Sequence, residues 1–146
     1  MKGGNPKVVA ALTAPKFSEK AQRAMESRVP CKAEKQRIAD EQERIISQGV
    51  GLPRTPDNAA FDLRGPKVGV EIKTMIDSKN GKVTVSGKAF ARKEAEAAGP
   101  PRLKTFLVVA DKRGGGTKYY IADHIGSLRV NSMTPTTIAG IRSMVR

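Results

Sequence analysis

The sequence predicts an α+β fold of the α/β-sandwich type, in which helices flank a mixed central β-sheet. Two observations predict it. Apolar residues recur at helical spacing before residue 49, and from residue 59 they alternate with a period of two. A helical segment at 86–98 then separates two groups of strands, an order that favours a mixed sheet. The length of 146 residues, 38% of them hydrophobic, is that of one domain with its own core.

The N-terminal part of the chain is expected to contain an arm and two helices. Residues 1–16 are rich in Gly and Pro and predict a flexible arm, followed by a single domain over 17–146. A first helix is expected over 18–28, where a serine can cap its start and a proline follows its end. A second helix is expected over 31–48, ending at Gly49. Its expected apolar stripe consists of three isoleucines (Ile38, Ile45 and Ile46), with Glu34 and Glu41 beside the stripe and Asp40 and Glu43 pointing the other way.

After a loop at 49–58, period-two alternation predicts the strands. Strands are expected at 59–63, 68–76, 82–85, 103–110 and 118–122, with a helix at 86–98 and a last helix from Thr134 to Val145. The segment 103–110 is the most strongly apolar, so it is expected to be the central, buried strand. The pair Asn80-Gly81 is typical of a tight hairpin turn and predicts that 82–85 pairs with 68–76.

The excess of basic residues indicates a polyanionic partner. The chain has 27 Lys and Arg residues against 14 Asp and Glu residues, a formal net charge of +13. Nucleic acid is the first candidate for the partner, and an anionic membrane surface is the second. A non-catalytic architectural binder would have the same charge, so the charge indicates the class of partner and no chemistry.

The single cysteine and the single histidine exclude several kinds of site. Cys31 alone can form neither an internal disulfide nor a thiolate zinc cluster, and His124 alone excludes mechanisms that use two histidines. No apolar run approaches the roughly 18 residues of a membrane span. Nucleic acid is the preferred polyanionic partner, so no membrane partner is expected. A reducing, cytoplasmic location is therefore expected.

The expected strand 68–76 places an acid and a base on one face. Alternate side chains of a strand point to opposite faces, so Glu71 and Lys73 lie together, away from the valines and isoleucines of the same strand. Asp62 is expected on the same face. On a surface strand, such a group of charged side chains would add little stability. A metal-dependent hydrolase of phosphodiesters would need all three side chains, so the sequence indicates a nuclease.

The expected hairpin brings two carboxylates within reach of one metal ion. With Leu63 opposite Val68 across the turn, Asp62 lies diagonal to Glu71, about 7 Å away. Carboxylates at this spacing can share Mg²⁺, which prefers oxygen ligands and usually takes one or two protein carboxylates, and Mn²⁺ can substitute for it. Such an ion activates water and neutralises charge on the phosphate. Lys73 can orient or deprotonate that water, or stabilise the phosphate oxygens.

These residues resemble the PD-(D/E)xK nuclease superfamily, with Asp62 as the first acid and Glu71-Ile72-Lys73 as the (D/E)xK motif. The resemblance implies a restriction-endonuclease-like core and Mg²⁺-dependent cleavage of a nucleic-acid phosphodiester, usually in DNA, with RNA as the other possibility. It also implies a metal-site acid on the first helix of the core, for which Glu41 is the best match and Glu34 the second. Asp57, in the literal Pro-Asp pair, is the alternative to Asp62. Small nucleases of this kind commonly pair, so a homodimer is also expected.

The stretch from Asp57 to about Met133 is similar as well to nuclease-like domains attached to phage head-morphogenesis proteins. The shared pattern is E-x-K-T at Glu71–Thr74, a Lys/Asn turn, and S-x-x-x-x-A-R-K at Ser86–Lys93. This similarity implies a bacterial or phage-infected host cell. The expected strand 82–85 departs from the superfamily pattern, in which a helix often follows the (D/E)xK strand directly.

Basic side chains outside the motif are candidates for nucleic-acid binding. On the expected helix 86–98, Lys88 and Arg92 share a face and Lys93 is adjacent, where they can contact the substrate backbone. For Lys93, a place in the site itself is the alternative. The turn residues Lys112 and Arg113 precede three glycines and are further candidates.

Two other functions fit the same sequence. A metal-independent ribonuclease, as in small phage or toxin enzymes, would use His124 together with Arg or Lys. A non-catalytic basic DNA-binding or phage structural protein would retain the motif as a degenerate site. The nuclease hypothesis predicts cleavage that EDTA abolishes, the ribonuclease hypothesis predicts RNA cleavage that survives EDTA, and the binding hypothesis predicts salt-sensitive binding without cleavage.

Overall fold

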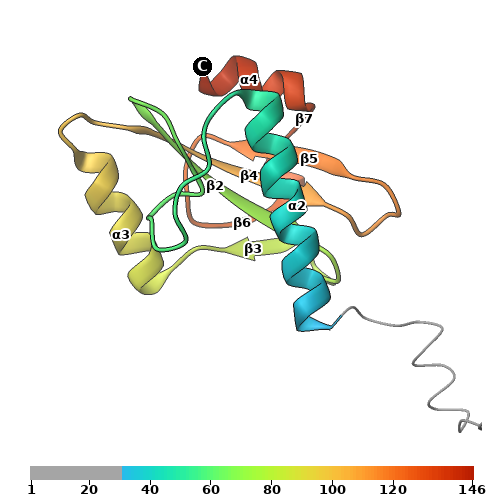
Figure 1. Cartoon of the computed structure of the whole chain (residues 1–146). Coiled ribbons are helices and arrows are strands. Elements are labelled where there is room, and N and C mark those ends of the chain that lie inside the picture. The colour runs from blue at the N-terminus through green and yellow to red at the C-terminus, as the bar shows by residue number, and fades with distance from the viewer. Residues whose placement is uncertain (1–30) are drawn as a thin grey trace, which may run out of the picture. The chain divides into compact units, whose positions relative to one another are not determined.

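The computed structural model describes residues 31–146, so the expected arm at 1–16 and the expected helix at 18–28 lie outside the described residues. The helices are α2 (Lys32–Val50), α3 (Gly87–Ala98) and α4 (Ile138–Val145), as Figure 1 shows. The strands are β1 (Leu63–Arg64), β2 (Val68–Met75), β3 (Lys82–Thr84), β4 (Lys104–Asp111), β5 (Lys118–Ala122), β6 (Ser127–Arg129) and β7 (Thr134–Thr136). A short 3₁₀ helix, η1, spans Val130–Ser132. Helices α2 and α3 begin and end within two residues of their predicted bounds.

The main sheet has five strands in the order β1-β2-β4-β5-β7. Strands β2 and β4 run parallel and are joined by the crossover that contains α3, whereas the other neighbours are antiparallel. Strand β4 is central, and its residues from Phe106 onward are buried. The mixed sheet with flanking helices confirms the predicted α+β fold, and the apolar segment 103–110 takes the predicted central position.

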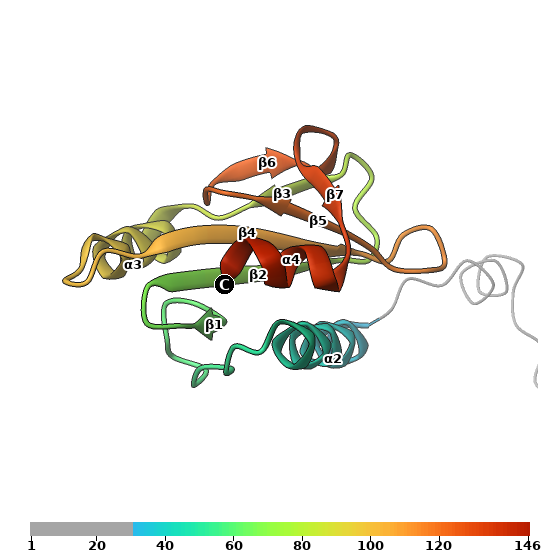
Figure 2. The same cartoon turned by 90° about the horizontal axis from the view of Figure 1, so that it is seen from above.

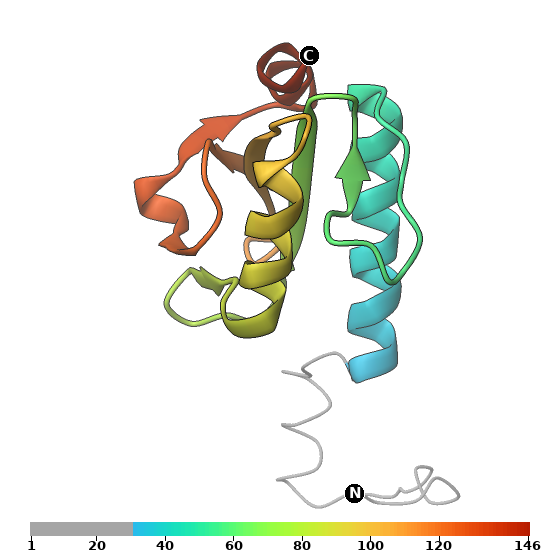
Figure 3. The same cartoon turned by 90° about the vertical axis from the view of Figure 1, so that its left-hand side faces the viewer.

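Different elements cover the two faces of the sheet. Helices α2 and α4 pack on one face, and a two-stranded ribbon of β3 and β6 lies over the other (Figure 2). Helix α3 stands on the side of β2 that faces away from α2 (Figure 3). The larger core, beneath α2 and α4, includes Ile46, Val50, Leu63, Val70, Val108, Ile121 and Ile141. A smaller core beneath the ribbon contains Met75, Val83, Leu107, Val109, Val130 and Met133.

The strand before the motif is shorter than predicted, and its register differs. The predicted strand 59–63 is reduced to β1, and a hydrogen bond of 2.9 Å from Gly65 N to Val68 O closes the turn. Leu63 lies opposite Val70, so the predicted pairing with Val68 is wrong. The turn is two residues shorter than predicted. A register shift of two residues leaves the side chains of β1 on their predicted faces, because side chains alternate with a period of two.

The turn at Asn80-Gly81 does not form the predicted hairpin. Gly81 adopts a φ of 67°, as a tight turn requires. Strand β3 nevertheless pairs with β6 in a separate two-stranded sheet, not with β2. The side chains of Ser78 and Asn80 accept the N–H groups of Gly81 and Lys82. These bonds fix a local bend but do not select the partner strand, and β6 was not among the predicted strands.

The last predicted helix begins later than expected. Its first residues form β7, an edge strand paired with β5, and an edge position tolerates Pro135. The side chain of Thr137 accepts the N–H of Gly140 at 3.0 Å and caps α4, which starts one residue later. Helix α4 approaches α2 closely at Gly49, where a Cβ atom would lie 2.2 Å from Ile138 Cγ2.

Candidate active site

The predicted alternation of side chains along β2 is confirmed. Val68, Val70 and Ile72 belong to the core beneath α2 and α4. Glu71 and Lys73 lie on the opposite face, toward α3 and the β3–β6 ribbon. On this face Glu71 is buried and Lys73 is partly exposed. The acid and the base of the motif therefore share one face of the sheet, and the acid lies deeper.

Asp62 lies beside Glu71, just before β1 begins. Leu63 is opposite Val70, so Asp62 is level with Glu71 in the same register. Asp62 N donates to Val70 O at 3.0 Å, and Asp62 Oδ2 accepts the N–H of Ile72 at 2.8 Å. The carboxylate thus takes the place of a strand carbonyl just before β1 begins. The register shift brings Asp62 level with Glu71 instead of diagonal to it.

Glu71 is held between two lysines from different elements. Lys73 Nζ, from the same strand, lies 3.3 Å from Glu71 Oε2, and Lys93 Nζ, from α3, lies 3.3 Å from Glu71 Oε1. The side chains of Glu71 and Lys93 are each 9% exposed, whereas that of Lys73 is 40% exposed. Both carboxylate oxygens therefore have a cationic partner, one buried and one accessible to solvent.

The electrostatics of the site disfavour the carboxylate form of Glu71. Burial raises the pKa of Glu71 most, and the nearby charge of Asp62 raises it further. Lys73 and Lys93 lower the pKa again, but the net shift is upward. Two carboxylates in one partly dry site repel each other, so an additional cation beside Asp62 and Glu71 would stabilise both in the ionised form.

Phe61 and Gly69 support the buried lysine. Lys93 Nζ lies 5.9 Å from the centroid of the Phe61 ring, within the range of a cation–π interaction. Phe61 itself is 1% exposed and packs against the backbone of Gly69. A Cβ atom at position 69 would lie 2.7 Å from Phe61 Cδ2, which is too close. Glycine at this position lets the ring lie flat on β2 beneath Lys93.

Of the acids predicted to hold a divalent ion, Asp62 and Glu71 lie at the same level of the sheet. Within residues 31–146, no group of three or more His, Cys, Asp or Glu side chains is arranged to hold a metal. Mg²⁺ commonly needs only one or two protein carboxylates, with water and substrate phosphate completing its shell. Two carboxylates match the number of protein ligands that such an ion takes. They do not fit a fully protein-enclosed structural metal.

Glu41, the predicted acid of the first helix of the core, does not face the site. Its side chain is 59% exposed and lies 3.9 Å from Arg44 of the same helix. The buried stripe of α2 runs through Gln42, Ile46 and Val50, which places Glu41 on the outer face of the helix. The prediction centred the stripe on the isoleucines, whereas Gln42 is buried because its Oε1 accepts the hydroxyl of Tyr119 at 2.8 Å. Glu34, the second match, lies in the first turn of α2.

Glu43, expected to point away from the site, is the helix acid beside Asp62. Burial raises the pKa of Glu43 most, and the charge of Asp62 raises it further. Arg54 holds Glu43 at 3.1 Å and also pairs with Asp40. These side chains line a hollow of about 280 Å³ together with Asp57, the alternative first acid. Glu43 lies on the margin of the buried stripe of α2, and the sequence indicates this only once Gln42 is counted as buried.

The three basic residues of α3 have different positions. Lys88 and Arg92 are exposed, and Arg92 donates to the carbonyl oxygen of Asn58, in the loop that leads to Asp62. Lys93 is buried against Glu71 and is not placed to reach a phosphate backbone at the surface. Its alternative role, as part of the site, is the one that the geometry supports. Phe90 and Ala97 lie on the same inner face at helical spacing, a signal available in the sequence.

The other residues predicted to bind nucleic acid lie in the β4–β5 turn, and His124, the candidate of the ribonuclease hypothesis, follows β5. Arg113 makes two hydrogen bonds of 2.9 Å to the Asp111 carboxylate, and this guanidinium lowers the pKa of Asp111. Lys112 Nζ donates to Thr117 Oγ1 at 2.9 Å. His124 is exposed, and its Nδ1 lies 3.2 Å from the Asp123 carboxylate. The structure does not bring His124 to Glu71 or Lys73, so it forms no common site with the motif.

Comparisons with known proteins do not identify a family. No family model matches this chain, and no curated protein matches it either. No helix within residues 31–146 is long and apolar enough to cross a bilayer. A functional assignment therefore depends on the side chains around Glu71.

Proposed function

We propose that this chain is a Mg²⁺-dependent nuclease that hydrolyses nucleic-acid phosphodiesters, with DNA as the favoured substrate. The proposal depends on one observation, the burial of Glu71 between Lys73 and Lys93 beside Asp62. A buried ion pair is weak as a source of stability, because desolvation of the charges offsets their attraction. Such an arrangement is instead expected in a functional site that must hold an ionised carboxylate in a fixed orientation.

In this proposal each side chain of the site has a separate role. Asp62 and Glu71 hold the ion, which when bound lowers the pKa of a water molecule and neutralises charge on the scissile phosphate. Lys73 is half-exposed and orients the attacking water or donates to a phosphate oxygen. Lys93 is buried and fixes the orientation of the Glu71 carboxylate. Glu43 acts through Asp62, since the two charges interact.

The arrangement of elements supports a restriction-endonuclease-like core. Strand β2, which carries the motif, lies between the antiparallel strand β1 and the parallel strand β4, and α3 follows it in the chain. Strand β3, which pairs with the later strand β6, is then an addition between the motif strand and the helix. This is the place at which the sequence departs from the superfamily pattern.

The charge of the chain supports a polyanionic substrate. The formal charge of +13 favours long-range attraction of nucleic acid, and Lys88 is an exposed candidate for backbone contacts on α3. A homodimer would allow both strands of a duplex to be cut, and we include it in the proposal. With one cysteine in the chain, a reducing cytoplasm is the proposed location.

A cleavage assay with matched variants tests the proposal. The purified protein is incubated with plasmid DNA and with RNA, in the presence of Mg²⁺ or of EDTA. We expect cleavage that EDTA abolishes and that Glu71→Gln and Asp62→Asn remove. Lys73→Met should lower the rate by about 10²–10⁴-fold, the usual contribution of a positioned acid or base. Glu41→Gln makes the same acid-to-amide change at an exposed position and should leave the rate unchanged.

Two outcomes would reject the proposal. RNA cleavage that survives EDTA and is lost in His124→Ala would indicate the metal-independent ribonuclease. Binding of DNA that weakens with salt, without cleavage under any metal condition, would indicate a non-catalytic binder. All variants are first checked for folding by circular dichroism, so that loss of activity is not confused with loss of structure.

A further inference from the structure

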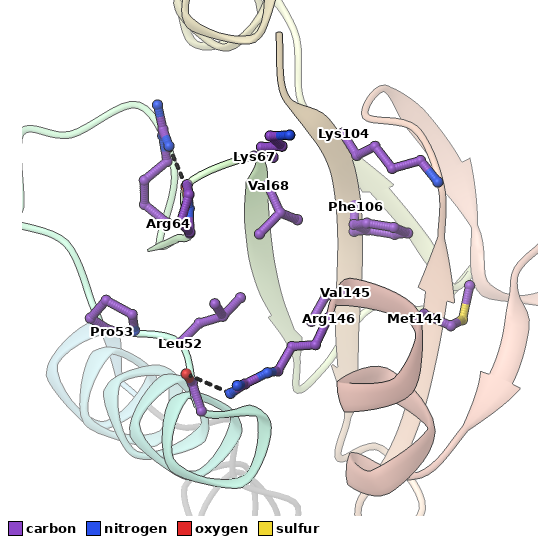
Figure 4. A pocket seen from close by; sticks show the side chains of 13 residues that line it. Leu52, Pro53, Arg64, Lys67, Val68, Lys104, Phe106, Met144, Val145 and Arg146 are labelled. Carbon is purple, nitrogen blue, oxygen red and sulfur yellow. Dashed lines mark hydrogen bonds between the residues drawn. The ribbon is translucent and has the colours of Figure 1, made fainter. Parts of the chain in front are cut away.

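A hollow of about 770 Å³ lies on the face of the sheet opposite Glu71, near the beginning of β2 (Figure 4). Four segments far apart in the sequence form it. They are the loop after α2, the β1–β2 turn, the first residues of β4 and the last turn of α4. The volume is within the range of pockets that hold ligands or anchoring side chains. None of the side chains proposed for catalysis lines this hollow.

The floor of the hollow is aliphatic. Leu52, Val68 and Val145 line it as members of the core beneath α2 and α4, and the buried Phe106 lies among them. At the margin stands Met144, which is 45% exposed and is the large hydrophobic side chain left exposed within residues 31–146. Methionine is flexible and polarisable and suits contacts with varied apolar side chains.

The rim of the hollow is basic. Its four charged side chains are all cations, and no Asp or Glu lines it. Two of the cations are already engaged, because Arg64 pairs with Glu96 at 2.9 Å and Arg146 donates to the carbonyl of Gly51 at 3.1 Å. These bonds fix the positions of the two arginines. Two lysines of the rim remain to contact a partner.

Lys67 and Lys104 are the two cations that remain. A backbone hydrogen bond of 2.9 Å joins Lys104 N to Lys67 O, so the two residues are neighbours across β2 and β4. Both are exposed, and neither has an ion-pair or hydrogen-bond partner for its side chain within residues 31–146. Both ammonium groups are therefore available to anionic groups of a partner.

We propose that this hollow is the docking site for an acidic peptide segment of a partner protein. An aliphatic side chain of the segment would sit on the floor beside Met144, and its carboxylates would face Lys67 and Lys104. A nucleic-acid strand fits the site less well, because base stacking needs an open aromatic face and Phe106 is only 4% exposed. A membrane surface also fits less well, since the apolar residues line a hollow and do not project.

Selection from a displayed library of random peptides tests this inference on the full chain. The wild-type protein is the target, and Lys67→Glu/Lys104→Glu is used for counter-selection. We expect enriched peptides with Asp or Glu flanking an aliphatic residue. Labelled synthetic copies should bind the double variant and Met144→Ser roughly tenfold or more weakly, a loss of about 1.4 kcal/mol. The control Lys79→Glu/Lys82→Glu makes the same charge change at exposed positions outside the hollow and should bind normally.

Three results would overturn the inference. They are the absence of enriched peptides, enrichment of peptides without acidic residues, and binding that falls equally in the control variant. A labelled single-stranded oligonucleotide is tested in parallel. If its binding falls in Lys67→Glu/Lys104→Glu but not in the control, the lysines serve nucleic acid and the peptide site is rejected. Melting curves establish that each variant is folded before binding is compared.

Discussion

Replacement of Lys93 by methionine tests the central electrostatic feature of the site. The side chain of Lys93 is 9% exposed and its Nζ lies 3.3 Å from Glu71 Oε1. Methionine has nearly the same length, so it fills the space without opening a cavity. The substitution leaves Glu71 buried, with Lys73 as its one remaining cationic partner, and Lys73 is 40% exposed.

The magnitude follows from the burial of the pair. Removing one partner of a buried ion pair typically costs about 3–5 kcal/mol, because the other charge remains buried without compensation. Lys73 still contacts the other carboxylate oxygen, so the lower end applies, and we expect a loss of about 3 kcal/mol in the free energy of unfolding. For a domain of this size, that loss corresponds to a decrease in Tm of about 10 °C.

A double-mutant cycle with Glu71→Gln separates the ion pair from other effects. Free energies of unfolding are measured by urea denaturation for wild type, Lys93→Met, Glu71→Gln and the double variant. We expect Glu71→Gln to restore most of the stability lost in Lys93→Met, since the amide carries no charge. Lys88→Met, an exposed substitution on the same helix, should change stability by less than about 0.5 kcal/mol.

The pH dependence of cleavage gives a second readout for Lys93. Lys93 lowers the pKa of Glu71, so its removal should move the acidic limb of the pH–rate profile to higher pH. A Lys93→Met protein with less than about 1 kcal/mol of destabilisation, no rescue by Glu71→Gln and an unchanged profile would refute the reasoning.

Three further predictions concern the same site. Because the pKa of Glu71 is raised, its negative charge destabilises the native state above that pKa and has no effect below the ordinary Glu pKa of about 4.3. Wild type should therefore lose stability as pH rises through this range, and Glu71→Gln should lose less, as measured by urea denaturation. Mg²⁺ at about ten times its Kd should stabilise wild type by about 1.4 kcal/mol in thermal melts and should not stabilise Glu71→Gln. Gly69→Ala should cost about 1–3 kcal/mol by displacing Phe61, whereas Gly116→Ala, where a Cβ meets no atom within 4 Å, should be nearly neutral in the same melts.

The features that were predictable from the sequence are those that local pattern determines. The period of two along β2 places Glu71 and Lys73 on one face whatever strand lies next to it, and the structure has this arrangement. The high apolar content of 103–110 requires burial on both faces, and a central strand provides it. The register predicted for β1 was wrong by two residues, and a shift of two residues does not change the face on which a side chain of the strand lies.

The features that were not predictable depend on partners distant in the sequence. A three-residue strand such as β3 has too little pattern to select its partner, and it pairs with β6, more than 40 residues later. The face that α2 buries was misjudged because Gln42 occupies a core position, and its partner Tyr119 lies 77 residues away. That misjudgement led to the choice of Glu41 over Glu43. A polar residue inside a helix stripe is resolved only when its hydrogen-bond partner is known.

Lys73 and Lys93 differ in solvent exposure, so we propose different roles for them in the site. A group that acts on water or phosphate must be reached by substrate, and Lys73, on the sheet and 40% exposed, satisfies that condition. Lys93 is 9% exposed and lies over Phe61. If it moved away from Glu71, a buried charge would be left without its partner, so Lys93 stays in place. Lys93 contacts one oxygen of Glu71 and fixes the orientation of the carboxylate. Lys73 contacts the other oxygen, and because it is accessible it can leave Glu71 and contact substrate. In the proposed site, the motif therefore supplies the lysine that would contact substrate, and the fold supplies the lysine that positions Glu71.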